Sequence, residues 1–424
     1  MTDSTLTSSN AITGSFALGN RTEAPALDPT RRMTAILGAT ILMTMIPVTM
    51  LVPVLKELVA ERFHAGPFAT HSFMCINLLG AVLAAPIGGA LADRWQRRKP
   101  LLILALAADA VLLLSMSFAG SLSGLLTLRF FEGAAHITAL TGVMALAADW
   151  AGTSRRGRMM GLVGGTLMLG TSIGAPLGGR LGQLDATFVL KVGAAISALA
   201  ALLATVGIHD APVRRASARV RDALLLLRRR PAMLVPYAYS AIDRFCVGLI
   251  VSTFVLFLAD RHHLSPAERG GLLAFFLFPM ALLCFPVGRL ADRVGRVALM
   301  AGGSLGFGVV FALYGYMPMS WMTATMIASG VLSAVMFAPN LALCADFAPP
   351  EARASAFAGF NVAGSIGFIA GPIIGGTIIH AFAASDGVPI AAYRAVFIVG
   401  GVSQFICVAA TLPYLLKFTR RPSS

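Results

Sequence analysis

Long apolar runs alternate with short polar connections along most of the 424-residue chain. A bilayer core of about 30 Å needs about 20 apolar residues per helix. Lipid offers the backbone no hydrogen-bond partner, and these runs are too long and continuous for barrel strands, so we expect helices. Twelve transmembrane helices are predicted, at approximately 33–56, 70–92, 101–120, 124–148, 159–180, 187–208, 233–259, 270–290, 298–317, 321–344, 355–380 and 392–416.

The composition agrees with a chain that lies mostly in lipid. Hydrophobic residues make up 57% and charged residues 12% of the chain, and the mean hydropathy is +0.79. Charged residues form about 25% of an ordinary soluble domain. This composition disfavours a soluble enzyme, a nucleic-acid-binding protein and a disordered protein. The polar first 30 residues or so contain no apolar segment of the kind found in signal peptides, and we expect a flexible cytoplasmic tail there.

The basic residues orient the predicted helices. The net charge is +14, and 24 of the 33 lysines and arginines fall on the side of the two termini. The positive-inside rule therefore places both termini in the cytoplasm, so the basic excess requires no nucleic acid. The predicted segments are a tail (1–32), a six-helix bundle (33–208), a basic linker (209–232), a second bundle (233–416) and a tail (417–424). Part of the linker is expected to form an amphipathic helix on anionic lipid.

Three short motifs occur twice in the chain at nearly one offset. Gly89–Arg94 recurs at Gly288–Arg293. Ala145–Asp149 likewise recurs at Ala342–Asp346, and Gly174–Gly179 recurs at Gly371–Gly376. The fold class that follows is an all-α membrane protein with twelve transmembrane helices in two parallel six-helix repeats. Repeats of this kind suit a transporter in which one half rocks against the other around a central site.

The duplicated loops resemble the signature loop of the major facilitator superfamily, with Gln96 where the family usually has Gly before the basic run. Arg129-Phe-Phe-Glu-Gly133 resembles the family's Arg-x-x-x-Gly element. The resemblance implies gating roles for Gly89, Asp93, Arg94 and Arg97 in the first loop and for Gly288, Asp292, Arg293 and Arg296 in the second. A carboxylate at a helix end can pair with an arginine or with a helix N-terminus in one conformation. Alternatively, these charges are solvated and serve only topology.

Glycine and proline crowd the fifth and eleventh predicted helices. The residues are Gly170, Gly174, Pro176, Gly178 and Gly179, and Gly367, Gly371, Pro372, Gly375 and Gly376. Small residues allow close helix packing, and proline allows a kink. The runs also resemble the Gly-Pro-x-x-Gly-Gly element of drug–proton antiporters, which favours export. The fifth-helix proline is displaced by one position, and the family spacing occurs in Gly371–Gly376.

Ionisable residues at membrane depth are candidates for function. Arg129, Glu132 and His136 follow helical spacing and share one stripe of the fourth helix. A movement of Arg129 relative to Glu132 could load and release a proton. A static ion pair that joins helices is the structural alternative.

Further ionisable residues lie in the third and seventh predicted helices. Asp109 lies within the third helix, and Asp243 and Arg244 lie within the seventh. Adjacent residues point about 100° apart on a helix, so Asp243 and Arg244 face different neighbours. One could line a cavity while the other pairs with another helix. Each of these residues could instead form a structural ion pair.

No residue pattern indicates an enzyme, a cofactor or a metal site. The five cysteines lie in apolar stretches without a CxxC spacing, and we find no phosphate-binding loop of the P-loop kind.

We expect a secondary transporter of a bacterial cytoplasmic membrane, working as a monomer, that exports a small amphipathic or lipophilic compound in exchange for protons. The alternatives are proton-coupled uptake of an organic acid, sugar or similar nutrient, and a non-transporting receptor or assembly protein that reuses the fold.

Overall fold

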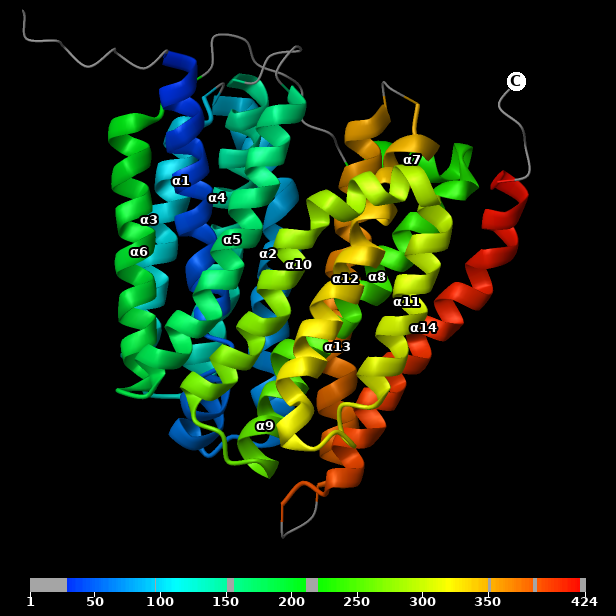
Figure 1. Ribbon diagram of the computed structural model, residues 1–424. Helices are drawn as coiled ribbons and strands as arrows, with labels where there is room; N and C mark the ends of the chain where they lie inside the picture. The colour runs from blue at the N-terminus through cyan, green and yellow to red at the C-terminus, as the bar shows by residue number, and fades with distance from the viewer. Residues whose placement is uncertain are drawn as a thin grey trace, which may run out of the picture.

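The structure, a computed structural model, describes residues 29–95, 97–150, 156–210, 220–349, 352–383 and 387–419. Both predicted tails and the predicted linker lie partly outside these residues. Nearly all of the described chain is helical (Figure 1).

Six long helices form the N-terminal half. They are α1 (Pro29–Met50), α2 (Pro67–Trp95), α3 (Lys99–Ser117), α4 (Leu122–Trp150), α5 (Arg156–Gly182) and α6 (Ala186–Gly207). A π-helical turn, η1 (Lys56–Glu61), connects α1 to α2.

A short helix, α7 (Val220–Arg229), and a 3-10 turn, η2 (Pro231–Met233), lead into the C-terminal half. The first spanning helix of this half is continuous over Pro231–Arg261, and it comprises η2, α8 (Leu234–Leu249), the π-helical η3 (Ile250–Phe254) and α9 (Val255–Arg261). The remaining five are α10 (Pro266–Val294), α11 (Arg296–Ala312), α12 (Met319–Phe347), α13 (Arg353–Phe382) and α14 (Ile390–Thr419).

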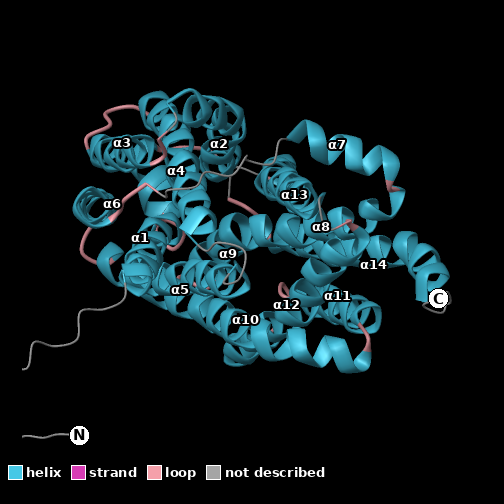
Figure 2. Cartoon of the chain, turned by 90° about the horizontal axis from the view of Figure 1, so that it is seen from above, coloured by secondary structure: helices cyan, strands magenta, loops and turns pink. Residues whose placement is uncertain are grey.

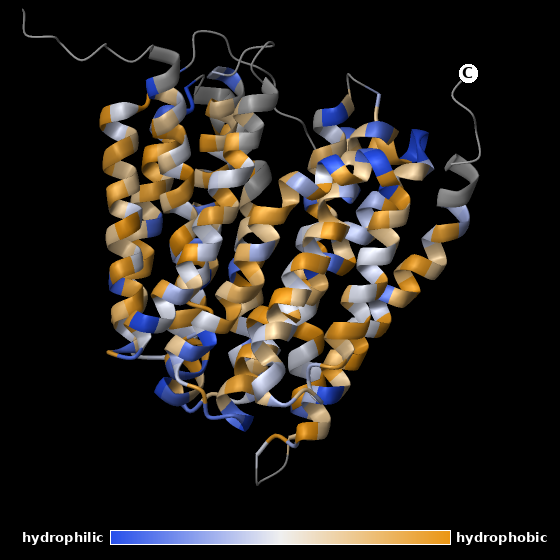
Figure 3. Ribbon diagram, viewed as in Figure 1, coloured by the Kyte–Doolittle hydropathy of each residue, from blue (hydrophilic) through white to orange (hydrophobic). Residues whose placement is uncertain are grey.

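The helices confirm the predicted fold class. In the described chain, ten helices are long and apolar enough to cross a membrane. Glycine-rich α5 is not among them, and α11 is a shorter apolar helix of 17 residues. The predicted ninth span was too long, because α11 ends at Ala312 and turns follow. Apolar side chains face outward along the bundle, for example Leu282, which is 77% exposed. Hydrophobic colour covers its middle and hydrophilic colour gathers near its ends (Figure 3).

The two halves lie side by side and meet through α2 with α13 and through α5 with α10 (Figures 1 and 2). We call the end where α1 begins and α14 ends the basic end, because Arg98 and Arg296 lie there. At the opposite end, η1 of one half meets α9 and α10 of the other. We call this the closed end. The ribbons of the two halves diverge from the closed end toward the basic end (Figure 1).

Candidate functional site

A buried ion pair lies on α4 in the N-terminal half. Arg129 Nη1 is 2.8 Å from Glu132 Oε2, and both side chains are 3% exposed. The same Glu132 oxygen accepts a 2.5 Å hydrogen bond from the side-chain amide of Asn77 on α2. The Arg129 guanidinium also lies over the ring of Phe73, again on α2, 4.8 Å from its centroid. The pair is therefore held against α2, the helix that borders the other half.

A second carboxylate, Asp109 on α3, faces the same place. Its Oδ2 accepts a 2.6 Å hydrogen bond from the hydroxyl of Ser197 on α6. Its Oδ1 is buried, lies 3.9 Å from His136 Nδ1, and has no hydrogen-bond partner among the described residues. The ligand atoms of Asp109, Glu132 and His136 all lie within 4.8 Å of one another. We call these three residues and Arg129 the α4 cluster.

The charges of the α4 cluster fit proton uptake better than metal binding. Two ionised carboxylates beside one guanidinium carry an excess negative charge, which is costly in a low dielectric unless it is neutralised. One bound proton removes that charge. The three ligand atoms are close enough to hold a cation, but the guanidinium of Arg129 already occupies one oxygen of Glu132 and repels a metal ion.

Asp243 and Arg244 of α8 point to different neighbours. Asp243 is 2% exposed, and neither of its carboxylate oxygens makes a hydrogen bond of normal geometry with a described residue, although Ser333 of α12 lies nearby. Arg244 is partly buried, and its guanidinium lies 5.6 Å from the ring centroid of Phe337 on α12. Within the described chain, the two form no ion pair with each other.

The first signature loop is only partly described. The surroundings of Gly89 and the side chains of Asp93 and Arg94 lie outside the described set, and Arg97 is exposed. The buried arginine here is Arg98, whose Nε lies 3.2 Å from Asp149 Oδ2 at the end of α4.

The second signature loop forms the corresponding pair. Arg296 contacts Asp292 at 2.7 Å and also pairs with Asp346 at the end of α12. Gly288 has open space around it, and Arg293 is exposed. Each half therefore has an arginine–aspartate contact at this place, with Asp149 and Asp346 in equivalent positions, although the motif offset aligns Arg296 with Arg97 rather than with Arg98. Both aspartates belong to the duplicated motifs, but their arginine partners lie too far away in the sequence to be recognised from it.

The glycine rows bring helices into backbone contact. A Cβ added at Gly170, Gly174 or Gly178 of α5 meets a carbonyl oxygen of α1 at 2.7, 2.3 or 2.0 Å. In the other half, a Cβ at Gly367 or Gly371 of α13 meets a carbonyl oxygen of α8 at 1.8 or 2.6 Å.

The last glycines of each row lie at the closed end. A Cβ at Gly179 meets the carbonyl oxygen of Pro266 in the other half at 2.4 Å, and one at Gly376 meets His71 Cβ at 2.9 Å. A Cβ at Gly375 meets Thr253 Oγ1 within its own half at 2.4 Å. Pro176 and Pro372 lie inside α5 and α13. Both rows therefore serve close packing, inside each half and between the halves.

Two charge pairs join the halves at the closed end. Glu57 of η1 pairs with Arg269 of α10, whose side chain is 0% exposed. The preceding residue, Lys56, lies 2.9 Å from Asp260 of α9. Tyr393 of α14 donates a 2.7 Å hydrogen bond to the other oxygen of Asp260. We call the Glu57–Arg269 and Lys56–Asp260 pairs the latch. Its charges are crossed, because each half supplies one acid and one base.

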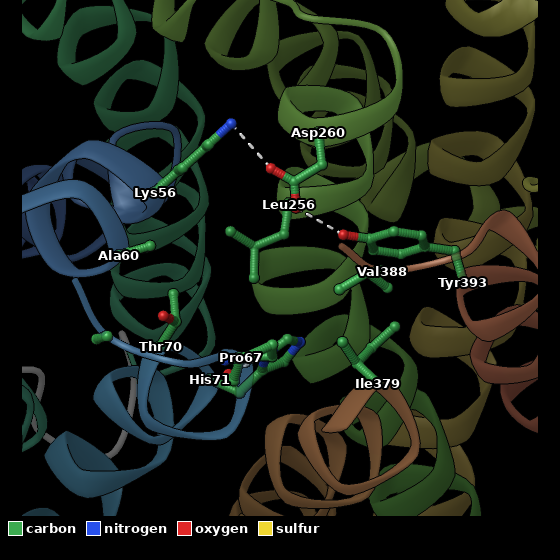
Figure 4. A pocket seen from close by; sticks show the side chains of 11 residues that line it. Lys56, Ala60, Pro67, Thr70, His71, Leu256, Asp260, Ile379, Val388 and Tyr393 are labelled. Atoms are coloured by element: carbon green, nitrogen blue, oxygen red, sulfur yellow. Dashed lines mark hydrogen bonds and ion pairs between the residues drawn. The ribbon is translucent and has the colours of Figure 1, made fainter. Parts of the chain in front are cut away.

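A cavity of about 180 Å³ lies beside the latch, between the halves. Figure 4 shows Lys56 reaching toward Asp260, with His71 on one side and Tyr393 on the other. His71 Nε2 lies 3.0 Å from Thr253 Oγ1 across the interface. These residues could not be selected from the sequence. The partner of a charge at a helix end becomes known only from the packing of the two halves.

The chain matches the family model of the Major Facilitator Superfamily over residues 37–258 and again over 237–424. It is 34% identical over 145 residues to the class H tetracycline resistance protein of Pasteurella multocida, an alignment that covers 33% of this chain and 35% of that protein. It is 24% identical to the 3-(3-hydroxy-phenyl)propionate transporter of Escherichia coli (strain K12), covering 82% of this chain and 87% of that one. A homolog of the multi-drug resistance efflux pump PmrA from Lactococcus lactis subsp. lactis (strain IL1403) is 25% identical, with 74% and 79% covered.

Solved transporter structures share the fold. A bacterial homolog of the human lysosomal transporter Spinster, in an inward-facing and unoccupied conformation, superposes with a TM-score of 0.78 at 14% identity, covering 91% of this chain and 96% of that one. A D-xylose–proton symporter gives a TM-score of 0.71 at 12% identity, with 89% and 98% covered. These relatives are transporters and not enzymes. The chain therefore belongs to the Major Facilitator Superfamily of membrane transporters and is most like its drug–proton antiporter branch.

Proposed function

We propose that this transporter exports a small amphipathic or lipophilic compound in exchange for protons, by alternating access. The α4 cluster is the observation that supports the proposal. It buries two carboxylates and an arginine inside one helix bundle. Ionisable side chains at membrane depth are energetically costly, and they typically belong to substrate, ion or proton pathways.

Within the cluster, Asp109 is the best place for the proton in this conformation. Glu132 Oε2 is already held by Arg129 and by Asn77. Asp109 keeps one oxygen without a hydrogen-bond partner, beside His136. Glu132 becomes the acceptor when α2 moves and takes the amide of Asn77 away. The proton thus moves between Asp109 and Glu132, with His136 beside both.

The shape of the chain supports an inward-facing state. The latch joins the halves at the closed end, while the basic end carries the signature loops. The positive-inside rule makes the basic end cytoplasmic. The protein then lies in the cytoplasmic membrane of a bacterium, with both termini on the cytoplasmic side. Each half supplies its own gating contacts, Arg98–Asp149 and Arg296–Asp346, so we expect a working monomer.

A second candidate function is proton-coupled uptake of an organic acid. The relative that covers 82% of this chain is named as a transporter of 3-(3-hydroxy-phenyl)propionate. An anion requires a free cation in the pathway, and Arg244 offers one because it stacks on Phe337 without a carboxylate partner among the described residues. The tetracycline and multidrug relatives favour export instead.

Transport by proteoliposomes with an imposed pH gradient tests the proposal. A panel of amphipathic cations, neutral lipophilic drugs and aromatic acids is loaded on either side. Export in exchange for protons predicts that at least one drug moves in the direction opposite to the imposed proton flux, and that this movement stops with Asp109→Asn. Flux of an aromatic acid along the proton gradient that is lost with Arg244→Gln supports uptake. Drug flux that ignores the pH gradient overturns proton coupling.

A further inference from the structure

The short helix α7 has one face packed on the protein and one face that no described residue covers. Ala223 and Leu226 are 3% and 7% exposed, and Leu226 joins a buried cluster with Tyr237 and Phe360. On the other side, Leu224 and Leu225 are 60% and 42% exposed.

Arginines continue this outer face by one helical turn. Arg228 follows Leu224 by four residues, and Arg229 follows Leu225 by four, so each arginine lies beside a leucine on the helix surface. Arg228, Arg229 and Arg230 are all exposed. Their side chains have no acidic partner in the described part of the chain. The outer face of α7 thus combines two apolar side chains with the positive charges of Arg228 and Arg229, and the exposed Arg230 follows directly after the helix.

The position of α7 gives this face a partner. Viewed from above, α7 lies outside the group of spanning helices, next to α13 and α8 (Figure 2). It lies at the basic end (Figure 1), so that the surface beside it is the edge of the bilayer rather than the space between the halves.

We propose that α7 is a binding site for anionic lipid headgroups, with Leu224 and Leu225 inserted at the acyl boundary and the three arginines on lipid phosphates. A helix lying in the interface buries its apolar side chains just below the headgroups, while arginines reach up to them. Each basic residue near an anionic membrane surface contributes to binding. A protein partner with an acidic surface matches the arginines but leaves no reason for α7 to lie over the bilayer.

The proposed lipid site on α7 lies next to helices that move when the halves rock. η2 follows α7 directly and begins the helix that carries Asp243 and Arg244, and Leu226 packs with Phe360 of α13. A lipid held by α7 therefore fixes the basic-end parts of α8 and α13, the helices that must shift when the halves rock.

Hydrogen exchange of the full-length protein in nanodiscs tests the site. Discs of phosphatidylcholine alone are compared with discs that contain one part phosphatidylglycerol to three parts phosphatidylcholine. We expect the amides of residues 222–230 to exchange about tenfold more slowly in the anionic discs. The triple variant Arg228→Gln/Arg229→Gln/Arg230→Gln should lose this difference. The matching triple lysine variant, which keeps the charge, should retain most of it.

Controls separate the possible sources of the effect. Arg289→Gln removes another exposed arginine of the C-terminal half and should leave the difference unchanged. Leu224→Ser/Leu225→Ser should weaken it while keeping every arginine. Equal exchange in the two kinds of disc overturns the proposal. Inorganic phosphate that slows exchange equally in phosphatidylcholine discs also overturns it, because the site is then a simple anion site.

Discussion

Glu57 and Arg269 form an ion pair between the two halves, and the arginine has no exposed surface. Two of its three nitrogens, Nε and Nη1, have no hydrogen-bond partner among the described residues. The pair is thus the main electrostatic contact of a buried group, and opening the closed end requires it to break.

We expect Arg269→Gln to shift the protein toward the conformation open at the closed end. Breaking a buried pair by removing one partner typically costs about 3–5 kcal/mol, and here the cost falls on the closed conformation. Distance measurements between spin labels at positions 61 and 263, on the two sides of the closed end, should show a longer population. The swapped variant Glu57→Arg/Arg269→Glu should restore the short distance. A short distance that Arg269→Gln leaves unchanged makes the pair incidental.

Lys56→Met should have a much smaller effect on the same distances. The side chains of Lys56 and Asp260 are 27% and 33% exposed, and exposed pairs contribute about 0–1 kcal/mol. Asp260 also keeps the hydrogen bond from Tyr393. A population shift as large as that of Arg269→Gln contradicts the ranking of the two latch pairs.

Glu132→Gln and Asp109→Asn should differ in stability. Glu132→Gln removes the only carboxylate among the described residues in direct ion-pair contact with the buried Arg129 and leaves Asp109 as the nearest remaining acid, so its melting temperature should fall clearly below that of the unmodified protein. Asp109→Asn replaces a carboxyl group that carries the proton in this conformation by a neutral amide, which has no close ion-pair partner to lose and can keep the hydrogen bond with Ser197. It should change the unfolding free energy by less than about 1 kcal/mol. Thermal unfolding in detergent measures both, and the reverse order argues against Asp109 as the proton carrier.

The two signature-loop pairs should differ in the same measurement. Arg98 and Asp149 have side chains 7% and 3% exposed, whereas those of Arg296 and Asp346 are 30% and 49% exposed. Asp149→Asn should therefore lower the melting temperature more than Asp346→Asn, because it removes the carboxylate from a buried pair rather than from a partly exposed one. Equal losses would mean that burial does not set the strength of these contacts.

Gly178→Ala should destabilise the protein, because its Cβ lies 2.0 Å from the carbonyl oxygen of Met50 and forces α1 and α5 apart. Overpacking of this kind costs about 1–3 kcal/mol or more. Gly164→Ala on the same helix is the matched control, since a Cβ there meets nothing within 4 Å. It should be neutral or stabilise by up to about 1 kcal/mol. If both variants lower the melting temperature equally, the close contact at Gly178 does not explain the loss.

Most of the fold could be predicted from the sequence, because the spans contain enough apolar residues to be recognised as membrane helices one by one. The same local spacing put Arg129 and Glu132 on one stripe, since residues three apart meet on any helix. Asp109 could not be joined to them in advance, because that contact depends on how α3 packs against α4. The latch depends on an even longer range, since Glu57 and Arg269 are 212 residues apart. The sequence alone does not distinguish Arg98 from the other loop charges, because its burial follows from the fold of the loop.

At the closed end, α5 and α10 approach with almost no side chain between them. A Cβ at Gly179 meets the Pro266 carbonyl oxygen, and one at Gly270 meets the Ala175 carbonyl oxygen at 2.5 Å. Rotation of a side chain cannot open such a contact, since there is no side chain to rotate. We therefore expect the closed end to open by separation of α5 and α10 along their whole line of contact, because no smaller side-chain movement breaks a contact between two backbones. Such a separation exposes peptide groups along both helices.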